Sequence, residues 1–245
     1  MKTPRIVVII PARLKSSRLP GKVLMDIQGK TMLRRVYEKA TSVFFPEDVF
    51  IATDSEKIEK TAGTFGARVV MTRDDHESGT QRIAEAVQTL NLKDEDIVVN
   101  LQGDEPSIST PLLQLVAGNL VIHPTAEIAT LFEFIKSEEE FQNPNVVKVV
   151  TDYKGHALYF SREPIPHRGF KNGLAKRHIG IYAYRVRTLK RLARNTHPSL
   201  ERIERLEQLQ TLYDGGIIHV GMAPFGTPAG IDSEEDLERA RRAFR

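Results

Sequence analysis

Asp104 is a candidate ligand for a metal ion in this chain of 245 residues. It follows the segment Ile97–Leu101, which is apolar apart from Asn100 and is typical of a strand buried on both faces. Open α/β sheets bind ligands at the carboxyl ends of their strands, and Mg²⁺ takes one or two carboxylates together with phosphate oxygens. The residue types therefore favour a magnesium site that works on phosphates. The alternative is an ordinary turn aspartate, since Gly103 precedes it and Pro106 follows.

A basic loop follows the first apolar run, Ile6–Ile10, which predicts a buried strand that Pro11 ends. The cations of this loop are Arg13, Lys15, Arg18 and Lys22. Open α/β sheets place a nucleotide's phosphates in this position, and fixed cations stabilise the charge that builds up on departing pyrophosphate. We interpret Arg13, Arg18 and Lys22 as a phosphate clamp and Lys15 as a solvated residue. The loop lacks the GxxxxGK[ST] and GxGxxG patterns, so a plain surface turn stays open.

Two helix starts carry polar residues with more than one possible role. Asp232 precedes the segment SEEDLERA and could cap that helix. However, Ser233 and Asp236 resemble a capping box by themselves, which leaves Asp232 for another partner. Ser78 opens the helical pattern SGTQRIAEAV, whose first N–H groups favour anions, although a plain N-cap serine has the same pattern.

Composition restricts the class of protein. Hydrophobic residues make up 40% and charged residues 27%, which fits one α/β domain over residues 1–245. No apolar run reaches the roughly 20 residues of a membrane helix, and the absence of cysteine fits a reducing cytoplasm. The net charge is +3, and the basic residues are interleaved with acidic ones along the chain. This pattern favours small anionic substrates over nucleic acid. No GxSxG or HExxH pattern points to a hydrolase.

Alternating strands and helices predict a three-layer α/β fold with a mostly parallel sheet. We expect strands over 6–10, 48–54, 67–72 and 97–101, and helices over 32–44, 55–66 and 78–90. The pattern changes after Pro106, where an antiparallel element is inserted over roughly 127–186, with a hairpin around 153–155. One continuous helix is predicted over 198–216, with Leu200, Ile203, Leu206 and Leu209 on its apolar stripe.

The segment PARLKSSRLPGKVL resembles the signature of the CMP-sugar synthetases, and further segments match that family in order. These are ATDSEKI, SGTQRIAEAV, VVNLQGDEP, NPNVVKVV, ALYFSREPIP, RHIGIYAYR, LERIERLEQLQ and GIDSEEDL. Within the family the chain is most similar to the branch that activates the eight-carbon sugar acid 3-deoxy-manno-octulosonate (Kdo). The resemblance implies a Rossmann-like nucleotidyltransferase sheet that carries the inserted antiparallel element.

The resemblance also implies roles for individual residues. Nucleotide binding is assigned to Pro11, Ala12, Arg13, Arg18, Lys22, Ser78 and Gln102. Sugar binding is assigned to Arg82, Arg162, His178, Tyr182, Glu207 and Gln208. The catalytic residues are Arg13, Lys22, Asp104 and Asp232, and the two aspartates are the Mg²⁺ ligands. From the pattern alone, His178 would be a packed or solvated histidine, and Glu207 and Gln208 a solvated helix flank.

The implied reaction transfers CMP from CTP to Kdo and releases pyrophosphate, for lipopolysaccharide biosynthesis, by a cytoplasmic homodimer. Three alternatives stay open. The sugar could be 8-amino-Kdo or another ulosonic acid, and the segment 166–177, which lies where sugar contacts would be, is short compared with the family. A nucleotide-sugar glycosyltransferase would normally have Asp-x-Asp, whereas Glu105 and Pro106 follow Asp104. A non-catalytic nucleotide-binding module would not need both Asp104 and Asp232.

Overall fold

The strands and helices alternate along the chain in a computed structural model, which describes residues 3–15, 19–76, 78–194, 200–224, 226 and 230–244. The strands are β1 (Ile6–Ala12), β2 (Asp26–Ile27), β3 (Lys30–Thr31), β4 (Val49–Thr53), β5 (Arg68–Met71), β6 (Ile97–Asn100), β7 (Ile128–Phe134), β8 (Lys148–Thr151), β9 (Ala157–Ser161), β10 (Lys176–Arg185) and β11 (Ile218–Met222). The helices are α1 (Met32–Thr41), α2 (Glu56–Gly63), α3 (Gly79–Thr89), α4 (Thr110–Ile122), α5 (Glu138–Gln142), α6 (Val186–Leu192), α7 (Leu200–Glu204), α8 (Leu209–Tyr213) and α9 (Glu234–Ala243). Two short 3₁₀ helices are η1 (Lys22–Leu24) and η2 (Pro46–Asp48).

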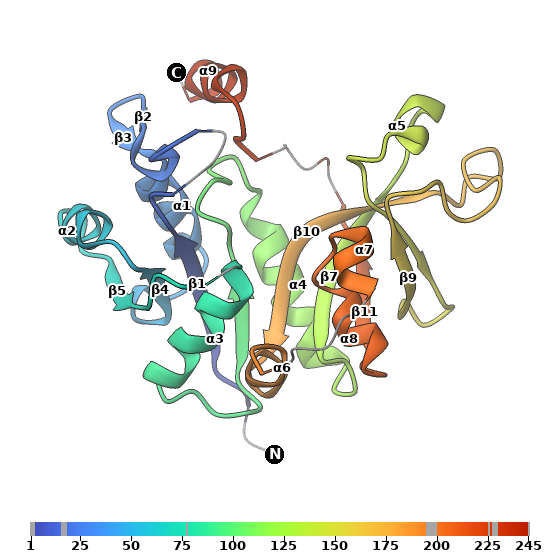
Figure 1. The fold of residues 1–245 in the computed structure, drawn as a ribbon, viewed down its shortest axis with the longest axis horizontal. Helices are drawn as coiled ribbons and strands as arrows, with labels where there is room; N and C mark the ends of the chain where they lie inside the picture. Colours follow the sequence, from blue (N-terminus) through green and yellow to red (C-terminus); the bar gives the residue numbers. More distant parts are fainter. Residues whose placement is uncertain are drawn as a thin grey trace.

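One large sheet contains most of these strands, in the order β11-β7-β10-β6-β1-β4-β5 (Figure 1). β1 pairs in parallel with β4 and β6, β4 with β5, and β7 with β11. β10 runs antiparallel to both β6 and β7, and β8 pairs with β10 and with β9. The predicted class, a mostly parallel sheet with an inserted antiparallel element, is confirmed.

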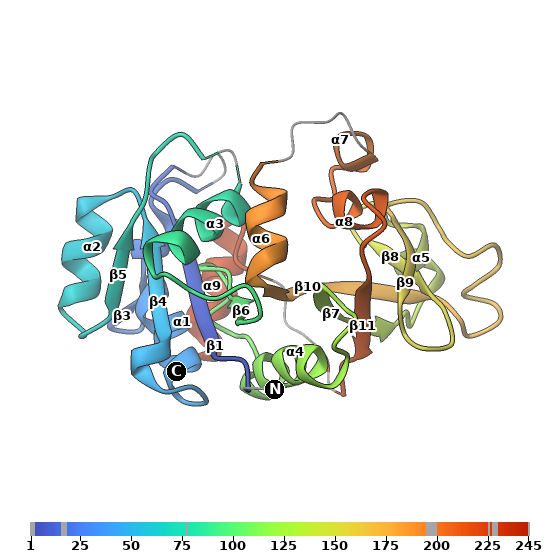
Figure 2. The same ribbon diagram turned by 90° about the horizontal axis from the view of Figure 1, so that it is seen from below.

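Helices cover both faces of the sheet, as the three-layer prediction requires. Figure 2 shows α3 and α6 on one face and α1 and α4 on the other. Buried apolar side chains of α1, α2 and α4 form one core with the sheet, and those of α3, α6 and α8 form a second core on the opposite face. Because β1 and β6 are buried on both faces, their sequences are continuous apolar runs rather than alternating ones. No helix in the described ranges is both long enough and apolar enough to cross a membrane.

Two sequence-based predictions about element ends were wrong. Pro11 does not end β1, since the strand continues to Ala12 and Pro11 pairs with Ala52 of β4. The helix predicted over 198–216 is broken: α7 ends at Glu204, Arg205 has a φ of 55°, and α8 begins at Leu209. Residues 198 and 199 lie outside the described ranges.

Tertiary hydrogen bonds explain the break between α7 and α8. Arg162, at the end of β9, donates from Nε to the carbonyl of Glu204 at 2.8 Å and from Nη2 to that of Arg205 at 3.5 Å. The Glu204 carboxylate in turn accepts from Ser161 Oγ at 2.7 Å. These contacts with β9 compete with continuation of the helix, and Ile203 of the predicted apolar stripe remains 81% exposed.

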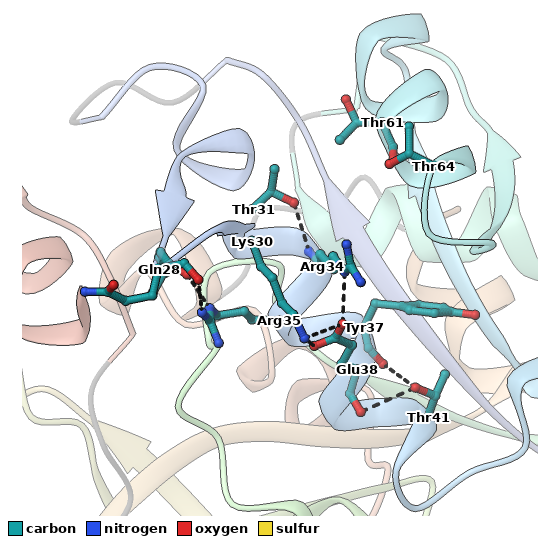
Figure 3. Close-up of polar contacts among 11 residues, drawn as sticks. Gln28, Lys30, Thr31, Arg34, Arg35, Tyr37, Glu38, Thr41, Thr61 and Thr64 are labelled. Carbon is teal, nitrogen blue, oxygen red and sulfur yellow. Dashed lines mark hydrogen bonds and ion pairs between the residues drawn. The ribbon is translucent and has the colours of Figure 1, made fainter. Parts of the chain in front are cut away.

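The hairpin β2–β3 connects α1 with α9 beside the basic loop. Arg35 of α1 donates to the carbonyl of Gln28 at 2.9 Å, as Figure 3 shows. The side chain of Gln28 donates to the carbonyl of Arg241 on α9 at 3.0 Å. Lys22 lies just before the hairpin and Asp232 just before α9, so this packing holds the two residues in the same region of the molecule.

Three histidines and one aspartate gather at the β11 edge of the sheet. The ring of His219 stacks on that of His123 with centroids 3.8 Å apart. His156 pairs with Asp152 at 3.3 Å, and its backbone bridges to that of His219. Burial lowers the pKa of His219 to about 4, and the neighbouring His123 and His156 lower it further while Asp152 opposes them.

We expect this cluster to make stability depend on acidity. The pKa of His219 falls from 6.5 to about 4 on folding, so the unfolded chain binds more protons between these values. Its contribution is fully present above pH 6.5 and is lost as the pH falls towards 4, by at most about 3 kcal/mol. Denaturant unfolding at several pH values should show a flatter dependence for His219→Phe than for the exposed control His167→Gln. Equal slopes in the two variants would contradict the prediction.

Candidate active site

A pocket of about 250 Å³ opens at the carboxyl ends of β1 and β6. Its lining residues are Pro11, Ala12, Arg13, Lys15, Lys22, Val23, His76, Ser78, Gly79, Arg82, Gln102, Gly103, Asp104 and Asp232. All of the predicted nucleotide-binding residues are among them except Arg18, which lies outside the described ranges. Lys15, predicted as a solvated residue, is exposed but also lines the pocket.

Glycine allows the loop after β6 to approach the end of β1. A Cβ atom on Gly103 would lie 3.1 Å from the carbonyl oxygen of Pro11, closer than ordinary van der Waals contact. Leu101 donates its backbone N–H to the carbonyl of Ile9 at 3.2 Å, which extends the pairing beyond β6. The following residue pair, Gly103 and Asp104, is therefore held against the end of the central strand.

Lys22 lies between the two candidate metal ligands. Its ammonium donates to Asp104 Oδ2, to Asp232 Oδ1 at 3.2 Å and to the carbonyl of Ile231 at 3.1 Å. Its side chain is only 13% exposed, whereas those of Asp104 and Asp232 are 27% and 45% exposed. All three residues line the pocket, and the two carboxylates are more exposed than the cation between them.

The backbone brings Asp232 next to Asp104 across a separation of more than half the chain. The N–H of Ile231 donates to the carbonyl of Asp104 at 3.0 Å. Ser233 is the N-cap of α9 and forms a capping box with Asp236, as predicted. Asp232 is therefore not needed as the cap, and its carboxylate contacts Lys22 instead.

The donor set around Lys22 suits a hard cation. Two carboxylates and one carbonyl converge on a single positive group, and oxygen atoms of these types are the ligands that Mg²⁺ prefers. The described residues contain no group of three or more His, Cys, Asp or Glu side chains that could hold a metal ion alone. A site of two aspartates is still sufficient for Mg²⁺ when substrate phosphates supply further oxygens.

The start of α3 forms a second wall of the pocket. Ser78 is the N-cap, because its Oγ accepts from the N–H of Gln81 at 3.2 Å. Arg82, predicted for the sugar, lines this pocket and is 3% exposed. Its guanidinium pairs with Asp54 at 3.2 Å and donates to Thr72 Oγ1 at 2.5 Å. Arg82 thus connects the pocket wall with the ends of β4 and β5.

A row of aromatic side chains lies on β10, and none of its residues is among the lining residues of the pocket. The rings of His178 and Tyr182 lie 5.3 Å apart, and Tyr182 stacks on Tyr184 at 5.6 Å. Burial, with the charges of Tyr184 and Glu207, raises the pKa of Tyr182 well above its ordinary value. The structure therefore places Tyr182 beside His178 and within electrostatic reach of Glu207, which comes from a distant segment.

Two other residues assigned to the sugar have distinct surroundings. Gln208 is 6% exposed, and its Nε2 has no hydrogen-bond partner among the described residues. An unpaired buried amide is costly unless a ligand or water satisfies it. Arg162 instead donates from its guanidinium to the carbonyls of Pro144, Glu204 and Arg205. Its side chain therefore holds the segment that carries Gln208.

The residues that connect the pocket with the aromatic row, Asn100 and Thr80, were not predicted from the sequence. Asn100 accepts from Gln102 Nε2 at 3.0 Å and pairs with Tyr182 across β6 and β10. The hydroxyl of Tyr184 hydrogen-bonds with Asn100 and with Thr80 at the start of α3. Asn100 is a polar residue at the end of a buried strand, and this feature of the sequence could have identified it as a candidate site residue.

Comparisons with known proteins agree with this geometry. The cytidylyltransferase family model matches residues 7–220. A 3-deoxy-manno-octulosonate cytidylyltransferase of Francisella tularensis subsp. holarctica is 51% identical over 244 residues, which cover 97% of each chain. One from Vibrio vulnificus is 49% identical over 96% of each chain. A solved structure of a CMP:2-keto-3-deoxy-manno-octonic acid synthetase in complex with CTP superposes with a TM-score of 0.91, at 39% identity over 98% of each chain.

Proposed function

The chain belongs to the cytidylyltransferase family and, within it, to the 3-deoxy-manno-octulosonate cytidylyltransferases, and from this premise we propose how its residues perform the reaction. It transfers CMP from CTP to Kdo, giving CMP-Kdo and pyrophosphate. The anomeric hydroxyl of the sugar acid attacks the α-phosphate of CTP, and the bond to the β-phosphate breaks. A direct, in-line transfer needs positioning and charge stabilisation rather than a covalent intermediate.

The observation that carries the proposal is the arrangement of Lys22 with Asp104 and Asp232 in the pocket. Bound Mg²⁺ would be held by the two aspartates, and it supplies Lewis-acid stabilisation of the phosphate oxygens. Lys22 and Arg13 neutralise the charge that develops on the departing pyrophosphate. Arg13 is exposed in the pocket lining, which leaves its guanidinium accessible to a triphosphate.

The base and sugar acid of the substrates occupy opposite sides of the metal site in this proposal. The nucleotide is surrounded by Pro11, Ala12, Ser78 and Gln102, and this assignment is supported by their place in the pocket lining. The sugar is contacted by His178, Tyr182, Glu207 and Gln208. This assignment is supported by the aromatic row and by the unsatisfied amide of Gln208. Arg82 is assigned to the sugar carboxylate because it lines the pocket, and Arg162 holds the segment that carries Gln208 through backbone carbonyls.

We further propose that the protein works as a homodimer in the cytoplasm, as one catalytic domain, and supplies CMP-Kdo for lipopolysaccharide biosynthesis. Exposed apolar side chains near the β8–β9 hairpin support an interface there, since Tyr153 is 91% and Leu158 60% exposed. Light scattering of the purified protein tests the dimer. A monomer that does not change mass with concentration would contradict it.

Pyrophosphate release tests the proposed reaction. With Mg²⁺ and CTP, release should require Kdo and should be accompanied by CMP-Kdo. Parallel reactions with 8-amino-Kdo and another ulosonic acid measure the choice of sugar, and reactions with UTP or ATP measure the choice of base. Sugar transfer from a nucleotide-sugar without pyrophosphate release would instead indicate a glycosyltransferase, and CTP binding without either product would indicate a binding module.

Lys22→Ala should reduce kcat/KM for CTP by about 100-fold or more, because removal of one fixed donor to developing charge has this effect in enzymes. The change also removes the cation that lies between Asp104 and Asp232. Steady-state kinetics with varied CTP provides the measurement. Lys60→Ala is the control, since Lys60 is exposed on α2 and forms only a 3.5 Å pair with Glu56. Equal kcat/KM in both variants would remove Lys22 from the site.

A further inference from the structure

β10 carries a bulge opposite Thr130 of β7, its neighbour in the sheet (Figure 1). Between the pairs Ile179–Leu131 and Ala183–Ala129, residues 180–182 of β10 face only Thr130. Bulges bend a strand and redirect its side chains, and they are common beside active sites. This one separates His178 from the residues that continue β10 towards α6.

The bulge lies within the row of sugar-binding residues. In an unbroken strand His178 and Tyr182 would face β7 residues four positions apart, but here His178 pairs with Phe132 while residues 180–182 face only Thr130, two positions away. The rings of His178 and Tyr182 are 5.3 Å apart, and the ring of Phe160 lies edge-to-face with that of His178 at 5.1 Å. The strand distortion therefore helps to bring the imidazole and the phenol into one wall.

Thr130 is fully buried, and its hydroxyl has three polar neighbours. Oγ1 lies 3.0 Å from the carbonyl of Ile179, 2.8 Å from that of Ile181 and 2.9 Å from His178 Nε2. A threonine hydroxyl has one hydrogen to donate and lone pairs with which to accept, whereas a carbonyl can only accept.

The number of donors decides which way these hydrogen bonds run. If Thr130 donated to His178, the carbonyls of Ile179 and Ile181 would both face the hydroxyl oxygen without a hydrogen between them. If Thr130 donates to a carbonyl, its oxygen can accept a hydrogen from His178 Nε2. The second arrangement leaves fewer opposed lone pairs in a buried place, where an unsatisfied polar contact is costly.

We infer that Thr130 is a positioning residue: it holds His178 as the neutral Nε2–H tautomer, so that the Nδ1 lone pair accepts a hydrogen bond from a hydroxyl of the sugar acid. The inference rests on the proposed function, which places His178 at the sugar. With Nε2 protonated by this arrangement, Nδ1 is the ring nitrogen that is left to accept a hydrogen bond. Burial lowers the pKa of His178 to about 3, in agreement with a neutral ring.

The tautomer determines which substrate group can bind. Nδ1 without a proton accepts from a hydroxyl and repels a carboxylate, whereas Nδ1–H or an imidazolium would favour a carboxylate. Thr130 thus contributes to sugar recognition through His178, although its own side chain is buried in the sheet.

The kinetic test compares Thr130→Val with Thr130→Ser. Valine has nearly the same shape but no hydroxyl, so KM for Kdo should rise about tenfold while KM for CTP stays unchanged. Serine keeps the hydroxyl and should restore KM for Kdo. Thr188→Val is the matched control, because Thr188 is also fully buried but its Oγ1 has no hydrogen-bond partner in the described structure.

Imidazole ¹⁵N NMR tests the tautomer without any assay of activity. In the wild-type protein the His178 signals, assigned by their loss in His178→Gln, should show a protonated Nε2 and an unprotonated Nδ1. Thr130→Val should shift this pattern towards a mixture, and Thr188→Val should not. A wild-type Nδ1–H tautomer would overturn the role of Thr130 even if Kdo is the substrate. The expected tautomer with unchanged KM for Kdo in Thr130→Val would overturn its part in sugar binding.

If the protein proved not to use Kdo at all, the proposed function would fail while the spectra still reported on Thr130 and His178. Because the wild-type spectrum needs no substituted Thr130, a poorly folded Thr130→Val protein would not prevent the test. Thr130→Ser then provides the comparison, and it should retain the wild-type tautomer.

Discussion

Asp104→Asn is expected to reduce turnover by more than about 100-fold. Replacing a residue that only hydrogen-bonds to a metal ligand already costs about 10–100-fold in metal affinity or activity, and a direct ligand should cost more. Asparagine keeps the size and one oxygen of the side chain but brings no negative charge to a cation. Asp104 is part-exposed and pairs with Lys22, so the loss of this pair should change stability little. Turnover at saturating CTP and Kdo, with Mg²⁺ varied, and thermal unfolding of the same sample provide the measurement.

Asp94→Asn is the matched control for Asp104→Asn. Asp94 also pairs with a lysine, since Lys190 Nζ lies 2.7 Å from its carboxylate, but it precedes β6 whereas Asp104 follows that strand. The control removes an equal charge at the opposite end of the same strand and should keep wild-type turnover. Should both variants lose activity equally, general electrostatics rather than a metal site would explain the effect. Wild-type turnover of Asp104→Asn would exclude Asp104 from the site.

Much of this site could be predicted because its residues occupy the ends of simple local patterns. Buried parallel strands give continuous apolar runs, so Asp104 could be placed just after a strand end from the sequence, whereas the end predicted at Pro11 was one residue too early. The capping box of Ser233 and Asp236 is also a local pattern. It correctly predicted that Ser233, and not Asp232, caps α9. Once these ends are fixed, the parallel topology itself brings them to one edge of the sheet.

The parts that could not be predicted depend on contacts between distant segments. The helical periodicity over 198–216 does not indicate that Arg162 donates hydrogen bonds to the carbonyls of Glu204 and Arg205. The bulge in β10 is equally hidden, because His178 and Tyr182 have the even spacing of a regular strand. Local patterns report which side chains can be buried, and the break and the bulge come from tertiary hydrogen bonds that form only in the folded chain.

Asp232→Asn is expected to keep the melting temperature and to lose about 10- to 100-fold or more in turnover. Asparagine caps helices as well as aspartate does, and α9 is in any case capped by Ser233. What the substitution removes is the negative charge that lies 3.2 Å from Lys22 and next to Asp104 in the pocket. Excess Mg²⁺ should restore part of the rate if the variant binds the ion more weakly.

Ser233→Ala, one residue away, should have the opposite effects. It removes the side chain that accepts from the N–H of Asp236 and should cost about 1 kcal/mol of stability, while the folded fraction keeps its turnover. Measuring unfolding and rate on both variants therefore separates capping from catalysis at adjacent positions. A destabilised Asp232→Asn with normal turnover would make Asp232 a structural residue. The two-carboxylate site would then be wrong, because Asp104 alone would have to hold the ion with the phosphates of CTP.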